Sequence, residues 1–254
     1  MFSFKQRRRE RIRRQPFPPE WVTILERIPF YQALSPADRE ELHGHILVFL
    51  DEKTFEGCAE LIITDEIRVT VAAYACLLLL HRPTDYYPRM RTIFVYPNEY
   101  FVPGAVRHVG PIVVEGEGRL GESWHRGPVV LAWDSLRRSA ADAHAAKNVV
   151  LHEFAHQLDD ESDGHDGTPE LPHRSMVAAW ARVLGREHQR LIEDIQHHRP
   201  TVLDEYGATN PAEFFAVATE AFFQNPVALK KRHPALYEQL AQFYRQDPAG
   251  RTGR

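Results

Sequence analysis

Two histidines and a glutamate stand at a spacing that suits metal-assisted hydrolysis. His152, Glu153 and His156 form an H-E-x-x-H pattern inside an apolar-periodic stretch at 148–158. The periodicity predicts a helix, and residues four apart on a helix share one face, so both imidazoles could bind one metal ion. Glu153 is rotated away from them and could reach a water on that metal without being a ligand. Zinc hydrolases use two such ligands, an open coordination position and an adjacent base.

The alternative is a buried helix on which these three residues fall by chance. The other positions of the helix are largely apolar: Leu151, Phe154, Ala155 and Leu158. We therefore expect the helix to be buried, and buried polar side chains need partners to offset their lost hydration. A metal ion would supply one partner to both histidines.

A catalytic zinc site needs a third protein ligand. The longer pattern H-E-x-x-H-x-x-G-x-x-H is absent, so the sequence favours a carboxylate on a later helix. Glu213 and Glu220 are the candidates, because they lie seven residues apart on one face of an apolar helix expected over 211–224. Glu213 also has a structural alternative, since it stands three residues after the predicted N-cap Asn210 and could bond back to it. The local sequence does not favour either glutamate over the other as the third ligand.

Two stretches of the sequence resemble a known bacterial family. Residues 152–159 read HEFAHQLD, and residues 206–216 read YGATNPAEFFA. Both are similar to the Mlc titration factor A family, zinc-dependent peptidases whose core resembles the protease domain of anthrax lethal factor. Three further stretches fit the strand region and the C-terminal helix of that family: GESW at 121–124, GPVVL at 127–131 and QFYRQDP at 242–248.

Carried over by position, the resemblance implies one Zn²⁺ per chain, bound by His152, His156 and Glu213. It implies that Glu153 is the general base that takes a proton from a zinc-activated water. It also implies that Tyr206 assists the transition state, although an aromatic ring covering the core is the structural alternative. The implied reaction is peptide-bond hydrolysis, with aminopeptidase action on small apolar N-terminal residues.

The resemblance implies a second class of function as well. The family takes its name from sequestering Mlc, a transcriptional repressor. The alternative is therefore a regulatory binding protein for an Mlc-like repressor, with peptidase activity secondary. A purely structural zinc site is a third interpretation, and a fourth protein ligand would indicate it. The expected partners are thus a peptide substrate and an Mlc-like repressor.

Composition argues against several other classes. The 254 residues carry a net charge of only −4, which argues against nucleic acid as a direct partner. The longest apolar run, at 69–80, is too short to cross a membrane, and no apolar stretch follows the basic N-terminus as in a secretory signal. Two cysteines are too few for a disulfide scaffold. We therefore expect a cytoplasmic protein that does not act at a membrane.

The predicted fold class is α+β and zincin-like, mostly helical with a small mixed β-sheet beside the H-E-x-x-H helix. We expect one zinc metallopeptidase domain at 19–248 and a frayed end at 249–254. Repelling arginines and the prolines that follow them predict a basic, disordered tail at 1–18. The expected strands are 92–96, 112–114 and 128–133, and the expected later helices are 64–80, 175–184, 187–197, 211–224 and 234–245.

Two segments beside the H-E-x-x-H helix are candidates for substrate contacts. The strand at 128–133 could pair with an extended peptide, or be a plain core or edge strand. The acidic loop at 159–166 could supply a carboxylate for a substrate ammonium group. Within it, Asp159 could orient a ligand imidazole, or be an exposed charge at the helix end.

Overall fold

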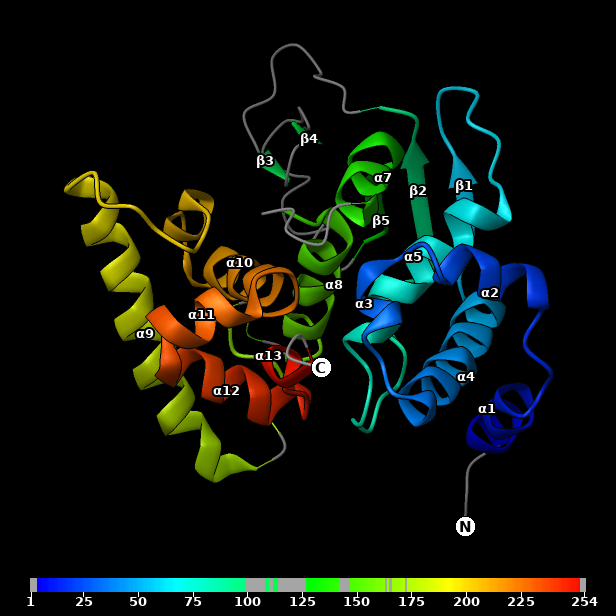
Figure 1. Ribbon diagram of the computed structural model, residues 1–254, viewed down its shortest axis with the longest axis horizontal. Helices are drawn as coiled ribbons and strands as arrows, with labels where there is room; N and C mark the ends of the chain where they lie inside the picture. Colours follow the sequence, from blue (N-terminus) through cyan, green and yellow to red (C-terminus); the bar gives the residue numbers. More distant parts are fainter. Residues whose placement is uncertain are drawn as a thin grey trace.

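The structure is a computed structural model, and the part of the chain that it describes is mostly helical (Figure 1). The described residues are 4–98, 108–109, 112–113, 127–141, 147–162, 164, 166–171 and 173–251. The helices of the first half are α1 (Phe4–Arg13), α2 (Pro19–Leu25), α3 (Pro29–Gln32), α4 (Pro36–Glu52) and α5 (Asp65–Leu77). The later helices are α7 (Trp133–Ala141), α8 (Val149–Asp159), α9 (Arg174–Gln196), the 3-10 helix η1 (Glu205–Ala208), α10 (Pro211–Gln224), α11 (Pro226–Arg232), α12 (Pro234–Tyr244) and α13 (Pro248–Arg251).

The sheet beside α8 is parallel rather than mixed. Its strands are β1 (Thr54–Gly57), β2 (Thr92–Tyr96) and β5 (Val129–Ala132), in the order β1-β2-β5. Both pairs are parallel because a long connection separates each strand from the next, and α5 makes the first crossover. The only antiparallel pair among the described strands joins β3 (His108–Val109) to β4 (Ile112–Val113), which form a separate ribbon.

The helix that carries H-E-x-x-H lies in the middle of the molecule. In Figure 1, α8 runs between an N-terminal group that contains α4, α5 and the sheet, and a C-terminal group formed by α9 to α12. It packs against α5, α10 and β5. The aromatic rings of Phe49, Tyr87 and Phe154 meet where α8 packs against the N-terminal group. The ring centroids of Phe154 and Tyr87 are 4.8 Å apart. A buried central position for α8 confirms the expectation from its apolar sequence.

The basic N-terminus is helical, not a disordered tail. Residues 4–13 form α1, which packs against α4. Arg9 is buried and donates from two nitrogens to the Glu52 carboxylate, both at 2.7 Å, and from a third to Asp85 at 2.5 Å. Arg8, which is exposed, forms a single ion pair with Asp51. Acidic partners that lie far along the chain therefore offset the repulsion between the arginines, which the local sequence does not reveal.

Two other expectations differ from the structure. The helices expected at 175–184 and 187–197 are one helix, α9, because a buried stripe that includes Trp180, Leu184 and Leu191 continues past Gly185. The C-terminal segment expected to fray forms α13 up to Arg251, whose guanidinium bonds to the Gln246 side chain at 3.1 Å, while 252–254 lie outside the described residues. No helix in the described part of the chain is both long and apolar enough to span a bilayer.

Candidate metal centre

The start of α8 is fixed by a cap that orients its first turn. Asn148 is the N-cap, and its Oδ1 accepts hydrogen bonds from the Val150 and Leu151 N–H groups, both at 3.1 Å. These bonds satisfy amides that have no partner within the helix. Every residue of the helix except His156 is buried. The H-E-x-x-H side chains are therefore held on a capped helix that is packed on nearly all sides.

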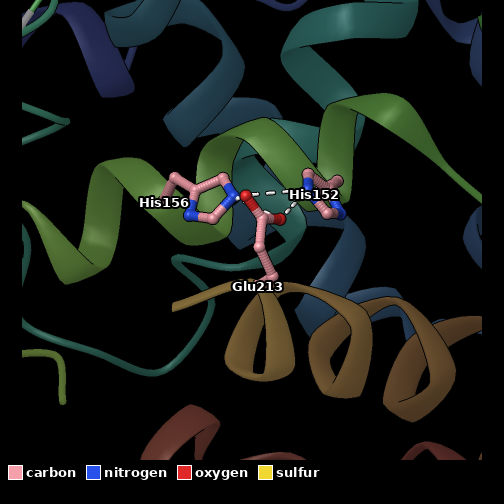
Figure 2. A group of neighbouring side chains, drawn as sticks. All are labelled: His152, His156 and Glu213. Carbon is pink, nitrogen blue, oxygen red and sulfur yellow. Dashed lines mark hydrogen bonds and ion pairs between the residues drawn. The ribbon is translucent and has the colours of Figure 1, made fainter. Parts of the chain in front are cut away.

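The start of α10 positions the third candidate ligand. Asn210 caps this helix by accepting from the Glu213 N–H at 2.9 Å, and Pro211 takes the first helical position. Both features were expected from the sequence. The carboxylate of Glu213 does not turn back to the cap, however. It extends away from its own helix towards α8 (Figure 2).

Three side chains from these two helices converge on one point. The Glu213 Oε2 lies 3.0 Å from His152 Nε2 and 3.2 Å from His156 Nε2. The two Nε2 atoms are 3.2 Å apart. Among the described residues, this is the only group of three or more His, Cys, Asp or Glu side chains close enough to hold a metal ion.

The separations between these three atoms fit a tetrahedral zinc site. Zinc binds imidazole nitrogen and carboxylate oxygen at about 2.0–2.2 Å, which places neighbouring tetrahedral ligands about 3.3 Å apart. The observed distances of 3.0, 3.2 and 3.2 Å are close to that value. Two imidazole nitrogens and one carboxylate oxygen are also the donor set of catalytic zinc sites, which leave one position open. The residues present therefore fit the metal.

Glu153 is a buried carboxylate next to this group. It is 8% exposed, and its Oε1 has no hydrogen-bond partner among the described residues. Burial raises the pKa of Glu153, although the neighbouring histidines His152 and His156 work in the opposite direction. A carboxylate with a free acceptor and a raised pKa is suited to taking up a proton.

Tyr206, to which the resemblance assigns a role in the transition state, lies beside this group. It lies in η1, which packs against α9 and α10, and its N–H donates to the Asp204 side chain at 3.0 Å. Its ring centroid is 6.0 Å from that of His152. Burial, together with the negative charge of Glu213, raises the pKa of Tyr206, so the phenol keeps its proton and can donate it in a hydrogen bond.

Glu220, the rival candidate for the third ligand, faces the other side of His152. Its Oε1 lies 2.8 Å from His152 Nδ1, and its Oε2 accepts from the Asn148 N–H at 2.5 Å. The two glutamates start about 10 Å apart along the helix axis, and their carboxylates lie against opposite ring nitrogens of His152. The structure brings Glu213 to the converging nitrogens, and Glu220 to the opposite ring nitrogen. No local pattern predicts the contact between Glu220 and Asn148, because it joins residues 72 apart along the chain.

The charges in the group are strongly coupled. Burial would lower the pKa of His152, but its hydrogen bonds to Glu213 and Glu220 outweigh that effect and raise the pKa well above its ordinary value. Burial would raise the pKa of Glu213, but its bonds to both histidines lower the pKa to about 2. Three carboxylates around two imidazoles thus create a negative site that favours a cation.

The segments expected to contact substrate have distinct positions. β5 pairs with β2 on one side and is the edge strand of the sheet within the described residues. Asp159 is 1% exposed and accepts from the Gly167 N–H at 2.9 Å, so it is not an exposed helix-end charge. No bond from Asp159 to an imidazole is found among the described residues. Two members of the acidic loop, Asp163 and His165, lie outside the described part of the chain.

Comparisons with known proteins agree with this geometry. The family model described as glucose-regulated metallo-peptidase M90 matches residues 4–245. An uncharacterized Synechocystis protein is 41% identical over 244 residues, which cover 95% of this chain and 89% of that protein. Mlc titration factor A of Serratia proteamaculans is 32% identical, over 87% of this chain and 86% of that protein. Mlc titration factor A of Yersinia pestis is 31% identical, over 92% of this chain and 87% of that protein. These matches confirm the resemblance to Mlc titration factor A found in the sequence, and the chain belongs to the glucose-regulated metallo-peptidase M90 family.

Proposed function

We propose that this protein is a zinc-dependent peptidase that hydrolyses peptide bonds, with His152, His156 and Glu213 as the zinc ligands. The observation that carries the proposal is the convergence of these three side chains, from two helices, at separations that fit a tetrahedral ion. Membership in a metallopeptidase family supports it. Zinc is favoured over other metals because two imidazoles and one carboxylate are a common donor set for catalytic zinc.

Each residue of the site has a distinct part in the proposed reaction. When bound, zinc would lower the pKa of a coordinated water towards neutrality and polarise a substrate carbonyl. The Glu153 carboxylate accepts a proton from the attacking water and passes it to the nitrogen of the leaving amine. The Tyr206 hydroxyl donates a hydrogen bond to the carbonyl oxygen as negative charge develops on it.

We further propose that the substrate is an extended peptide that pairs with the free edge of β5. Among the described strands β5 is an edge of the sheet, and it packs directly against α8, so a peptide added to it would lie beside the metal ligands. Aminopeptidase action on small apolar N-terminal residues is the most specific form of this proposal. A carboxylate of the acidic loop at 159–166 would then hold the substrate ammonium group.

The central test replaces Glu153 with Gln, which keeps the size of the side chain but removes its basic carboxylate. Zinc content per chain should stay near one, because Glu153 is not a ligand. Hydrolysis of an alanyl anilide should fall by about 10²–10⁴-fold. The matched control is His156→Ala, which should lose both zinc and activity, and an N-acetylated alanyl substrate should resist the wild type.

Two results would contradict these proposals. Full activity of the Glu153→Gln variant would show that this residue is not the base. Wild-type protein that contains no zinc and hydrolyses no peptide would overturn the peptidase assignment itself. Rapid cleavage of N-acetylated peptides would leave the peptidase standing and remove only the aminopeptidase preference.

A second candidate function is regulatory binding of a transcriptional repressor. The observation that favours it is that relatives named Mlc titration factor A match this protein over most of its length. The same Glu153→Gln protein separates the two, because a binding role does not need the base. Capture of a purified Mlc-type repressor by this variant, combined with no peptide hydrolysis by the wild type, would favour the binding protein.

A further inference from the structure

The Glu220 carboxylate has no part in the proposed reaction, yet it contacts both the ring of His152 and the start of α8. The residue is 5% exposed and lies in the second half of α10. One of its oxygens accepts from the backbone N–H of Asn148, at the start of α8. The other lies 2.8 Å from His152 Nδ1, on the opposite side of the ring from Glu213. Both oxygens of one buried side chain are therefore occupied by different partners.

These two partners differ in a way that matters for the metal. The Asn148 N–H is a backbone amide and can only donate a hydrogen bond. The His152 ring can carry its proton on either nitrogen, and its partner decides which. An ionised carboxylate can only accept, so a neutral His152 must carry its proton on Nδ1. Its Nε2 then presents a lone pair towards His156 and Glu213, as a metal ligand requires.

We propose that Glu220 is a positioning residue that fixes the ligand tautomer and the ring orientation of His152. This inference rests on the zinc site proposed above. The same carboxylate binds the backbone amide at the start of α8, so it also fixes the position of the His152 ring along α10. Partners of this kind, bonded to the outer nitrogen of a ligand imidazole, strengthen metal binding by holding the ring in place.

The test compares Glu220→Gln with Glu220→Ala, because the inference predicts an unusual order. A glutamine has one acceptor oxygen and one amide NH₂ group. Its oxygen will accept from the Asn148 N–H, which cannot change, and its NH₂ group will then face His152 Nδ1. That arrangement selects the opposite tautomer, with the proton on Nε2, where it blocks the metal. An alanine imposes no tautomer.

Zinc affinity, measured by competition with a chelator of known affinity, is the main readout. We expect Glu220→Gln to bind zinc about 10–100-fold more weakly than the wild type, and more weakly than Glu220→Ala. A purely structural role predicts the reverse, since glutamine fills the same space while alanine leaves a cavity. The inference would be overturned if Glu220→Gln bound zinc as tightly as the wild type. It would also be overturned if zinc affinity fell in the order wild type, Glu220→Gln, Glu220→Ala.

A spectroscopic readout follows the proton itself. In zinc-loaded wild type labelled with ¹⁵N-histidine, the Nδ1–H of His152 should exchange slowly with solvent, because Glu220 accepts its hydrogen bond. In zinc-loaded Glu220→Ala this proton should exchange rapidly, while Nε2 remains on the metal. An equally protected proton in both proteins would contradict the proposal.

Glu187→Gln is the matched control. Glu187 is also buried, and it accepts from a histidine nitrogen, His233 Nδ1, at 2.7 Å, but this pair joins α9 to the start of α12. Its substitution should lower stability without changing zinc affinity. Wild-type protein that fails to bind zinc would refute the proposed zinc site, whereas wild-type binding with an unaffected Glu220→Gln would refute only the role of Glu220.

Discussion

The three glutamates around the histidines have the same chemical group but different contacts. Glu213 meets both Nε2 atoms through one oxygen. Glu220 meets the other side of His152 and a backbone amide. Glu153 has an oxygen with no partner among the described residues. The position of each carboxylate relative to the two rings is therefore enough to suggest a ligand, a positioning residue and a base.

Tyr206→Phe tests the proposed role of the phenol in stabilising the oxyanion. The substitution removes only the phenolic hydroxyl, whose pKa is raised by burial and by the negative charge of Glu213. We expect kcat to fall by about 10²–10³-fold, as for loss of one oxyanion donor, with KM and zinc content little changed. Steady-state kinetics with metal analysis checks this. Loss of zinc with the hydroxyl would instead assign Tyr206 to holding Glu213 in place.

At the level of elements, α8 and α10 are connected at both ends. The start of α8 meets the second half of α10 through Asn148 and Glu220. The end of α8 meets the start of α10 through Asp159, which binds the Gly167 N–H, and Gly167 in turn lies against Pro211. The two helices therefore run in opposite directions with contacts at both ends. This pairing holds a ligand on one helix at a fixed distance from ligands on the other.

Gly167→Ala tests the second of these connections. Gly167 has φ of 78°, and an added Cβ would overlap the Pro211 carbonyl oxygen. We expect a loss of about 1–3 kcal/mol in stability from the left-handed backbone, together with weaker zinc binding as the start of α10 shifts Glu213. Thermal unfolding and chelator competition measure the two effects.

Gly185→Ala is the control for Gly167→Ala. Gly185 lies inside α9, and a Cβ there would meet no atom within 4 Å. The same change should raise stability by about 0.5–1 kcal/mol, because alanine is the better helix former. If Gly167→Ala proved as stable as Gly185→Ala, the close approach to Pro211 would not constrain the site.

Local signals in the sequence predicted many of the helices and strands. Contacts between residues far apart in the sequence decided how these elements pack and which side chains meet. The Asn210 cap and Pro211 marked the start of α10 correctly. The sequence could not choose between Glu213 and Glu220, because that choice depends on where α10 lies beside α8. It also split α9 at Gly185, since the buried stripe that keeps the helix continuous depends on tertiary packing. The parallel direction of the sheet and the folded α1 likewise depend on distant partners.

For the whole molecule, one partly buried carboxyl group, that of Glu161, gives stability an unusual dependence on pH. Burial raises the pKa of Glu161 to about 7, despite the nearby positive charge of Arg82. Its Oε1 has no hydrogen-bond partner among the described residues. The unfolded chain ionises this group from about pH 4.5 upwards, but the folded chain does so only near pH 7. Glu161 therefore lowers stability as the pH rises through this window, and the full loss persists above it.

Glu161→Gln should remove this penalty. We expect the substitution to raise the free energy of unfolding on the order of 1–2 kcal/mol at pH 8, after allowing for partial screening by solvent. The gain should disappear at pH 4, where the glutamic acid is neutral in both states. Melting temperatures at the two pH values provide the comparison. An equal gain at both would point to packing rather than ionisation.

The third proposed ligand lies far along the chain from the other two. Glu213 follows His156 by 57 residues. An isolated helix as short as α8 is marginally stable in water, so its two histidines alone form no lasting site. Under the proposed function, a chain still growing on the ribosome has no catalytic centre until α10 has emerged and docked. The proposed activity therefore depends on a contact between two segments that are made at different times, and a fragment that ends before α10 should neither hold the metal nor hydrolyse peptides.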